Sequence, residues 1–309
     1  MAIVKLKKRQ RPPTKLERSV ERVARRRATR QLLRVPWCRF RKAYVAYPRW
    51  LALTLWAQAI LSAEGGTSRW LAANLKKRSR GLIDHEALQI EPGLLVLRVQ
   101  EWIHNRVFRK AKEEGWLDAL IFFGVRALHS RSAWAYWEHC ESEWETKRPG
   151  MYPSFKKWWE TARQYQFCEK ATTARIATAL KRYVELQAVI HWLHPLLRSN
   201  RDLPATAAAE VRRGWPGLLE FCSSIDRTRP DAKGTLAKRL AEWMEDRYFA
   251  QPRKEGWLNI VVEQARNEPR HVRMLEFWKR STQELPRNPA TAYPSFREWR
   301  RAADSYIPD

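Results

Sequence analysis

Apolar residues recur at three- and four-residue steps along most of the chain, which is the spacing of helices that bury one face. Trp50, Leu53, Trp56 and Ile60 follow this spacing within a predicted helix over residues 44–63. Strand signals are nearly absent, because the sequence has no Asn-Gly or Asp-Gly hairpin turn and no long alternating apolar run. The pattern therefore predicts an all-α fold.

One stretch of this helical pattern occurs twice. Glu101–Tyr165 is repeated as Glu242–Tyr306, which follows 141 positions later without a gap, and 17 of the 65 paired positions are identical. The shared segments include Glu-Gly-Trp-Leu at 114–117 and 255–258, and Tyr-Pro-Ser-Phe at 152–155 and 293–296. Within the latter, Ser154 and Ser295 stand where a helix begins after proline, so both are expected to be N-caps.

A weaker match lies upstream, at a shift of 136 positions. It pairs Trp56 with Trp192, Gly81 with Gly217, and Lys76-Lys77 with Arg212-Arg213. The two matches together predict two tandem helical-bundle repeats of about 120 residues, a size that suits whole domains better than short solenoid units. The expected organisation is a basic arm over residues 1–45, repeat 1 over 46–166, a connecting helix over 167–181 and repeat 2 over 182–309.

Each unit is expected to hold five or six helices. After a Trp-bearing first helix and a short basic one come a long helix carrying Glu-Trp, the Gly-Trp-Leu helix, a Trp/Tyr helix and the Tyr-Pro-Ser-Phe helix. The long helices are expected over Leu94–Glu113 and Leu236–Ala250, and the Trp/Tyr helices over Ala133–Thr146 and Val272–Glu284. The twinned aromatic residues are interpreted as the core of each unit.

The arm begins with an extended stretch that Pro12 and Pro13 favour, followed by a predicted helix over residues 15–34. Thr14 and Glu17 have the spacing of a capping box at its start. Its thin apolar stripe consists of Leu16, Val20, Val23, Leu32 and Leu33. Two interpretations stay open: the helix gains order against phosphates, or it packs on the body through this stripe. An organelle transit peptide fits poorly, because such peptides are rich in Ser and poor in acidic residues.

Charge narrows the class of partner. The formal net charge of the chain is +26, and residues 1–42 hold 16 Lys and Arg against two Glu. Such an excess favours a polyanionic partner, since cations that neutralise phosphates release condensed counterions. The candidate nucleic-acid-binding residues are Arg22, Arg25, Arg26, Arg27, Arg30, Arg34, Arg39, Arg41, Lys42, Lys76, Lys77, Arg78, Arg80, Arg212 and Arg213.

The sequence signals for catalysis or metal binding are weak. His191 and His194 could form half of a metal site, but no carboxylate stands four residues from either. His139 and Cys140 diverge by about 100° on a helix, too far to share a proton. The sequence has no phosphate-binding Gly loop, no nucleophile elbow and no Cys-x-x-Cys pair. We therefore expect no catalytic residues, no metal and no cofactor.

These observations predict a non-enzymatic nucleic-acid-binding subunit that contacts phosphate backbones with little sequence readout, as part of a larger nucleoprotein assembly. RNA and DNA are not separable at this point. The first alternative is a helical scaffold that binds other protein subunits and is only anchored by its arm, and the second is an unfamiliar all-α enzyme. The most apolar run, Trp50–Ala63, is too short for a bilayer, and the four scattered Cys suit a reducing compartment, so we expect no membrane partner and a cytoplasmic location.

Overall fold

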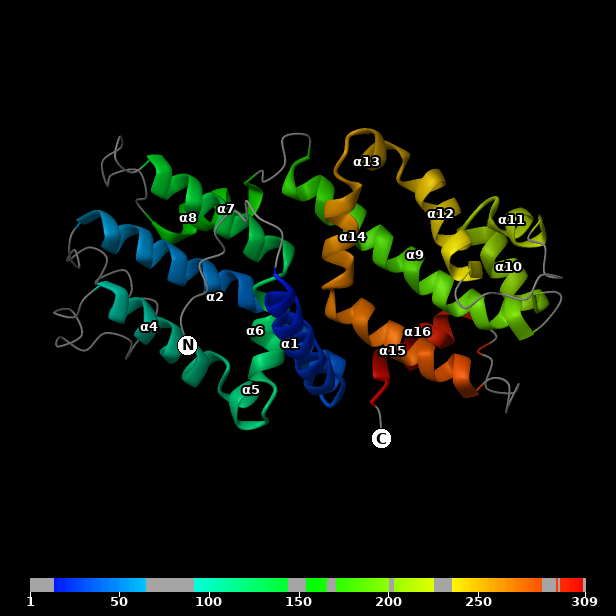
Figure 1. Ribbon diagram of the computed structural model, residues 1–309, viewed down its shortest axis with the longest axis horizontal. Helices are drawn as coiled ribbons and strands as arrows, with labels where there is room; N and C mark the ends of the chain where they lie inside the picture. Colours follow the sequence, from blue (N-terminus) through cyan, green and yellow to red (C-terminus); the bar gives the residue numbers. More distant parts are fainter. Residues whose placement is uncertain are drawn as a thin grey trace.

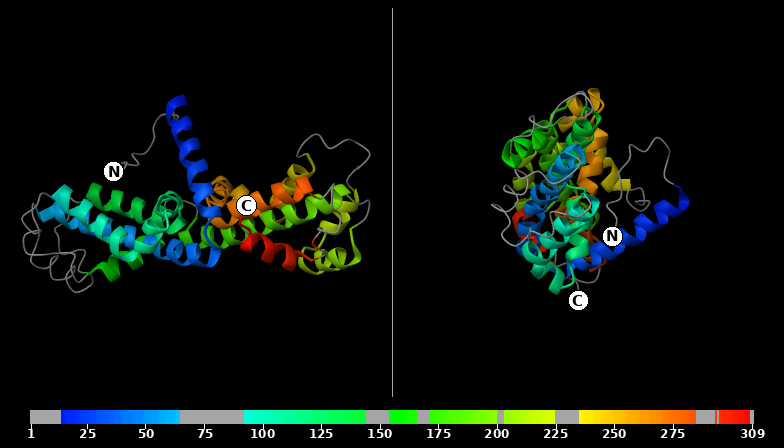
Figure 2. Two further views of the ribbon diagram at one scale, coloured as in Figure 1. Left: turned by 90° about the horizontal axis from the view of Figure 1, so that it is seen from below. Right: turned by 90° about the vertical axis from the view of Figure 1, so that its left-hand side faces the viewer.

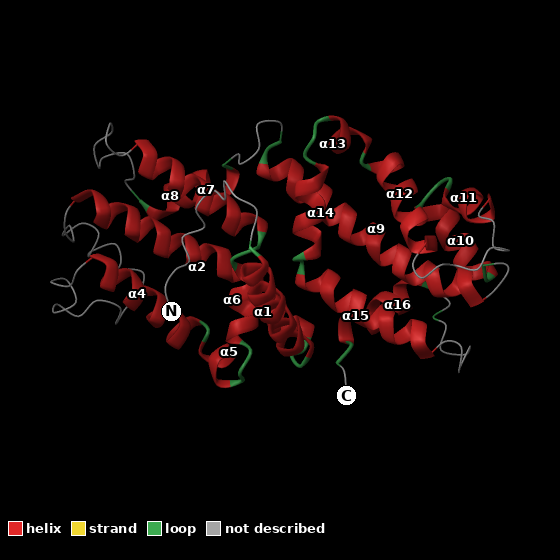
Figure 3. Ribbon diagram, viewed as in Figure 1, coloured by secondary structure: helices red, strands yellow, loops and turns green. Residues whose placement is uncertain are grey.

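The computed structural model describes residues 14–64, 92–143, 154–165, 171–199, 203–224, 235–284, 293 and 295–307. These residues form helices joined by short connections, with no β-strand among them (Figure 3). The predicted all-α fold is confirmed. None of the helices in these ranges combines the length and apolar content needed to cross a bilayer.

Helix α1 (Lys15–Leu33) begins at the predicted capping box. The Glu17 amide donates to Thr14 Oγ1 at 3.2 Å, and the Thr14 amide donates to Glu17 Oε2 at 2.7 Å. These two bonds satisfy amides that have no partner within the helix. The N-terminal end of the helix projects from the rest of the molecule, and contacts with the lobes begin at Glu21 (Figure 2).

The apolar stripe of α1 does not pack on the body as one surface. Leu32 and Leu33 are buried, whereas Leu16, Val20 and Val23 are 74%, 60% and 63% exposed. At 3.6 residues per turn, Leu32 lies about 160° around the helix from Leu16, so the two ends of the predicted stripe face different directions. Packing through the whole stripe is therefore wrong, and only its last turn reaches the body.

The first lobe comprises the helices from α2 to α8 and a π-helical turn. Its elements are α2 (Trp37–Glu64), α4 (Pro92–Trp102), the π turn (Ile103–Val107), α5 (Arg109–Glu113), α6 (Leu117–Gly124), α7 (Leu128–Glu143) and α8 (Phe155–Gln164). The expected long helix Leu94–Glu113 is thus interrupted, because the chain leaves helical geometry at Phe108, with φ −106° and ψ 24°.

The second lobe comprises the helices from α9 to α16. They are α9 (Thr173–Ser199), α10 (Ala205–Gly214), α11 (Leu218–Ser224), α12 (Thr235–Tyr248), α13 (Ala250–Lys254), α14 (Leu258–Arg266), α15 (Pro269–Glu284) and α16 (Phe296–Ser305). The residue expected to divide connecting helix from repeat 2, Lys181, lies inside α9, as the expected arm boundary at residue 45 lies inside α2. Each lobe therefore opens with one long uninterrupted helix.

Helix boundaries agree between the lobes at the shifts found in the sequence. A shift of 141 carries α5, α7 and α8 onto α13, α15 and α16 with identical ends, and a shift of 136 carries the start of α2 onto the start of α9. Ser154 and Ser295 accept hydrogen bonds from the amides three residues on, which confirms both predicted N-caps. This agreement is what a duplication requires and supports the predicted repeat.

Ring contacts in the cores agree as well. Tyr47 packs on Phe108 with ring centroids 5.7 Å apart, and the equivalent Tyr183 packs on Phe249 at 5.3 Å. The pairs Trp56–Phe155 and Trp192–Phe296 lie 5.7 Å and 5.6 Å apart. Each lobe thus uses its twinned aromatic residues as core, as the sequence predicted.

The two lobes are inverted with respect to each other (Figure 1). Helix α8 lies at the upper left and its equivalent α16 at the lower right, while α5 lies below the centre and α13 above it. Helices α7 and α15 both start at the centre and run outward within their own lobes, but a residue near the start of each packs in the opposite lobe (Figure 1). Leu128 belongs to the core of the second lobe, and Val272 to the core of the first. This exchange ties the lobes together without a linker between independent cores.

Candidate nucleic-acid interface

The largest described collection of candidate site residues lies on α1. From Lys15 to Arg27 every residue is exposed or half-exposed, and Ala28 is the first buried one. Thirteen helical residues span about 20 Å. The candidates within α1 are Arg22, Arg25, Arg26, Arg27 and Arg30, and Arg34 is its exposed C-cap residue.

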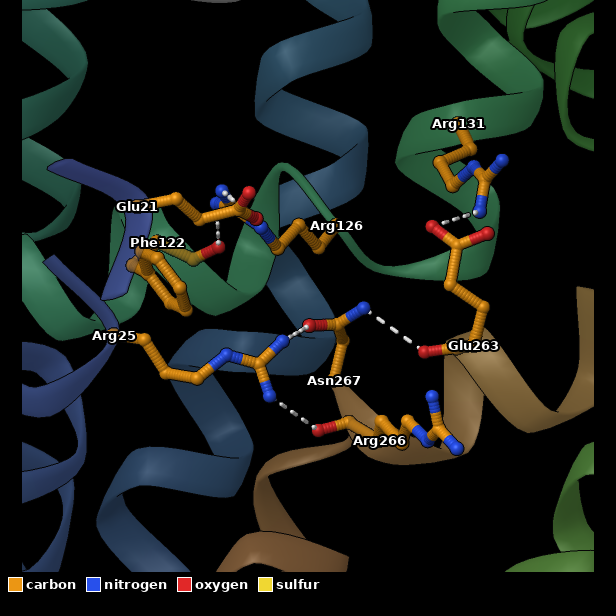
Figure 4. Close-up of polar contacts among 8 residues, drawn as sticks. All are labelled: Glu21, Arg25, Phe122, Arg126, Arg131, Glu263, Arg266 and Asn267. Atoms are coloured by element: carbon orange, nitrogen blue, oxygen red, sulfur yellow. Dashed lines mark hydrogen bonds and ion pairs between the residues drawn. The ribbon is translucent and has the colours of Figure 1, made fainter. Parts of the chain in front are cut away.

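Two of these candidates hold α1 to the body. Arg25 donates to the Arg266 carbonyl at 3.4 Å and to Asn267 Oδ1 at 2.5 Å, at the end of α14 (Figure 4). Arg27 Nη2 lies 2.8 Å from Asp118 Oδ2 on α6. These contacts bind α1 to both lobes, so Arg25 and Arg27 are placed as anchors of the helix as well as sources of charge.

A third anchor uses the carboxylate of Glu21. Its Oε1 lies 3.5 Å from Arg126 Nη2, and Arg126 also donates to the Phe122 carbonyl at 2.9 Å and covers the Phe122 ring at 3.9 Å (Figure 4). Burial lowers the pKa of Arg126, and Glu21 opposes that shift. A guanidinium seated on an aromatic face and paired with a carboxylate fixes the angle at which α1 leaves the body.

The connection after α1 is held by a buried arginine that sequence reasoning missed. Arg273 has no exposed surface, and its Nη2 donates to the carbonyls of Leu32 and Val35, both at 2.6 Å. Its Nη1 donates to the Tyr306 carbonyl at 2.5 Å. Burial lowers the pKa of Arg273 to about 10, so it stays charged at neutral pH. The only sequence signal was that Arg273 aligns with Ser132 of the other repeat, so that a large cation and a small hydroxyl stand at equivalent positions.

A further contact joins the lobes beneath α1. The Tyr44 hydroxyl of α2 donates to Glu268 Oε2 at 3.1 Å, at the start of α15. Burial raises the pKa of Glu268 to about 7, while the hydrogen bond from Tyr44 and the charge of Arg270 oppose the shift. The base of α1 therefore rests on a surface to which both lobes contribute.

Arg39 occupies a position that recurs in both lobes. Its Nη1 lies 3.2 Å from Glu114 Oε1, and the equivalent Arg175 Nη2 lies 2.8 Å from Glu255 Oε2. Hydrogen bonds from Arg175, Trp257 and Gln251 lower the pKa of Glu255 to about 2. A pair built the same way twice favours a structural role for Arg39, and it extends the likeness of the lobes upstream of residue 46.

The remaining candidates divide into three groups. Arg41 and Lys42 are exposed on the second turn of α2, close in sequence to α1. Arg212 and Arg213 are exposed in the last turn of α10, at the end of the second lobe far from α1 (Figure 1). Lys76, Lys77, Arg78 and Arg80 lie outside the described residues, so their role in nucleic-acid binding stays a prediction.

The histidines considered for chemistry lie in packed surroundings. His191 stacks on Trp278 with centroids 4.9 Å apart and on His271 at 5.7 Å, and His194 meets the edge of Trp278 at 5.3 Å. Burial lowers the pKa of His191, and it lowers that of His271 to about 4. His139 stacks on Tyr165 at 5.4 Å. No group of three or more metal-ligating side chains occurs within the described part of the chain.

Comparison with known proteins found no matching family model, no similar curated protein and no similar solved structure. The functional conclusion therefore rests on the geometry and charge of the molecule itself.

Proposed function

We propose that this protein is a non-enzymatic nucleic-acid-binding subunit that contacts phosphate backbones with little sequence readout, within a larger nucleoprotein assembly. The observation that carries this proposal is the exposed cationic surface of α1. Arg22, Arg26 and Arg30 are exposed, and no hydrogen bond or ion pair joins them to another described residue. An uncompensated row of guanidinium groups is suited to phosphate.

Several contacts with the lobes hold this row of guanidinium groups in place. The anchors formed by Glu21, Arg25 and Arg27, and the clamp formed by Arg273, fix the base of α1 on both lobes. A fixed helix loses less conformational entropy on binding than a free arm would. In this proposal the lobes act as a platform that presents α1, and Arg41 and Lys42 extend the charged surface at its base.

The test is the salt dependence of affinity for a labelled oligonucleotide, measured by fluorescence anisotropy between about 50 and 200 mM salt. We expect a steep log-log slope that the combined substitutions Arg22→Gln, Arg26→Gln and Arg30→Gln reduce by about 2 to 3, near 0.9 for each phosphate that the variant no longer neutralises. The control removes three exposed cations from α8, by Lys156→Gln, Lys157→Gln and Arg163→Gln.

A smaller change in the α8 control supports a specific role for α1. Equal slopes for the two variants would assign binding to net charge alone. A flat slope for the parent protein, or no binding to any oligonucleotide, would overturn the proposal.

A helical scaffold is the second candidate, and the exposed side chains of Leu16, Val20 and Val23 favour it. Apolar groups at this exposure on a projecting helix are typical of a surface that another protein covers. Light scattering on the purified chain distinguishes the candidates. A folded monomer that binds nucleic acid tightly weakens the scaffold interpretation, whereas self-association abolished by Leu16→Ser, Val20→Ser and Val23→Ser favours it.

A further inference from the structure

The outer face of α1 has a regular arrangement of cations. Lys15, Arg22, Arg26 and Arg30 fall within a sector of about 80° around the helix axis, turned away from the face that holds Ala28 and Leu32. From Arg22 to Arg30 the guanidinium groups are four residues apart, a rise of about 6 Å for each step. Each step also turns about 40° around the axis, so the row is inclined by about 26° to it, yet it stays on one side of the helix, where it can follow one phosphate strand.

The two carboxylates of α1 are kept from this face. Glu17 accepts the Thr14 amide in the capping box, and Glu21 turns toward Arg126 of the body. Arg25 and Arg27 are also occupied by the body. The contacts that anchor α1 thus leave an outer face with positive charge alone.

An aliphatic stripe lies beside the cationic row. Leu16, Val20 and Val23 fall within about 60° of one another, next to Arg26 and Arg30 around the helix. All three are exposed by more than half. A partner that suits both surfaces presents phosphates along one line and apolar groups beside them.

A single-stranded partner fits this helix poorly. Single strands are bound largely by stacking bases on aromatic side chains. Helix α1 contains no aromatic residue, and every Trp, Tyr and Phe among the described residues is buried or half-buried. The described surface therefore offers charge and aliphatic groups without a stacking platform, which favours a duplex.

Groove dimensions separate the two kinds of duplex. An α-helix with its side chains is about 10–12 Å across, and the major groove of B-DNA is about 12 Å wide, whereas that of A-form RNA is too narrow for side chains to read. The projecting part of α1 is free of the lobes on its outer side (Figure 2). This part of α1 can therefore enter a groove without a collision between the lobes and the duplex.

We propose that α1 inserts into the major groove of B-form duplex DNA, with Arg22, Arg26 and Arg30 along one phosphate strand and Val20 and Val23 against base edges, where thymine methyl groups are exposed. This proposal rests on the proposed function and names its ligand class. It assigns the aliphatic stripe to the same partner as the cationic row.

The test uses the full chain and four labelled probes of one sequence, each about 20 base pairs or nucleotides long, two turns of B-DNA. They are duplex DNA, the same duplex with glucosylated 5-hydroxymethylcytosine, duplex RNA and single-stranded DNA. Glucosylation fills the major groove and leaves the phosphates unchanged. We expect plain duplex DNA to bind tightest, and glucosylation to weaken binding by about tenfold or more, a loss of about 1.4 kcal/mol.

The substitutions Val20→Ser and Val23→Ser provide the matched variant, since they change no charge and both side chains are exposed in the free protein. We expect them to weaken binding to plain duplex DNA and to leave the salt slope unchanged. Equal binding to glucosylated and plain duplex, or tighter binding to duplex RNA or the single strand, would overturn groove insertion and leave the proposed function standing. Failure to bind every probe would overturn both.

Discussion

The two lobes share helix boundaries and core contacts, yet they hold α1 through different residues. On the first lobe α1 packs on α6, and the core residues in and next to this helix include Ile121, Phe122 and Val125. The equivalent positions of α14 hold Val262, Glu263 and Arg266. An aromatic ring that supports Arg126 in one lobe is thus a carboxylate in the other, where Glu263 pairs with Arg131.

The two lobes are therefore alike in their cores and different at the surfaces that contact α1. Aromatic pairs such as Tyr47–Phe108 and Tyr183–Phe249 keep the cores alike, because close-packed interiors tolerate little change in volume. Surface positions are free of that constraint. The first lobe packs α6 against α1, and the second supplies Arg273, which donates to the Leu32 carbonyl at the end of α1.

The largest expected effect comes from giving Arg273 the side chain of its equivalent, Ser132. Arg273→Ser leaves the carbonyls of Leu32, Val35 and Tyr306 without their donor, and we expect a loss of about 3 kcal/mol in the free energy of unfolding. Urea denaturation followed by circular dichroism measures it. Arg270→Ser, which removes a half-exposed pair with Asp304, is the control and should cost about 1 kcal/mol or less. Equal losses in the two variants would show that the buried hydrogen bonds of Arg273 stabilise the fold no more than the Arg270–Asp304 ion pair does.

Acid should next distinguish the stability of the two lobes, because the core of the second lobe holds histidines at positions where the first lobe has none. The second lobe holds His191 and His271 where the first has Leu55 and Ser130. The pKa of His271 is about 4 in the folded protein, and an unfolded histidine titrates near 6.5. Because the unfolded state then binds more protons, stability falls as pH drops from about 6.5 to 4, by up to about 1.4 kcal/mol per pH unit for each histidine.

The measurement is the unfolding free energy at several pH values for the parent and for His191→Leu with His271→Ser. The difference between the two curves isolates the histidines from Glu268, whose raised pKa acts in the opposite direction. We expect this difference to grow below pH 6.5, in favour of the variant. Parallel curves would show that the buried histidines do not titrate on unfolding.

A smaller loss of stability is expected from exchanging the equivalent residues Gly124 and Ala265, and both exchanges should destabilise the protein. A Cβ on Gly124 would overlap the Tyr47 ring, whereas the equivalent position in the second lobe is already Ala265. We expect Gly124→Ala to cost about 1–3 kcal/mol through overpacking, and Ala265→Gly to cost about 1 kcal/mol through helix propensity. Thermal unfolding of the two variants measures both, and a stabilised Gly124→Ala protein would contradict the difference in packing.

The smallest effect is expected at the ion pairs that the lobes share. Arg39→Gln and Arg175→Gln each remove an exposed or half-exposed partner of a glutamate, so each should cost less than about 1 kcal/mol and nearly the same amount. Neither should change the affinity for duplex DNA by more than about twofold, since structural pairs add little to phosphate binding. A large loss of affinity in Arg39→Gln alone would show that Arg39 takes part in binding nucleic acid.

The sequence determined the local structure and the likeness of the lobes. Helical spacing, the Thr14–Glu17 capping box and the Ser154 and Ser295 N-caps depend on neighbours within a few residues, and the structure confirms them. Glu-Gly-Trp-Leu likewise fixes a turn, since Gly115 takes φ +75° and only glycine adopts such a conformation at little cost. Exposure of Arg22, Arg26 and Arg30 followed from charge, because unpaired guanidinium groups are rarely buried.

Long-range packing of the helices selects the residues that make contacts between distant parts of the chain. In the sequence, Arg25 and Arg27 are two more members of a basic run. Their partners Asn267 and Asp118 lie far away in the sequence, so no local pattern identifies them. No local pattern marks Arg273 as buried, yet three carbonyls from distant segments surround it. Burial and pairing depend on how helices pack, and no periodicity within one helix records where its neighbours lie. The face that α1 turns outward was settled by those long-range contacts.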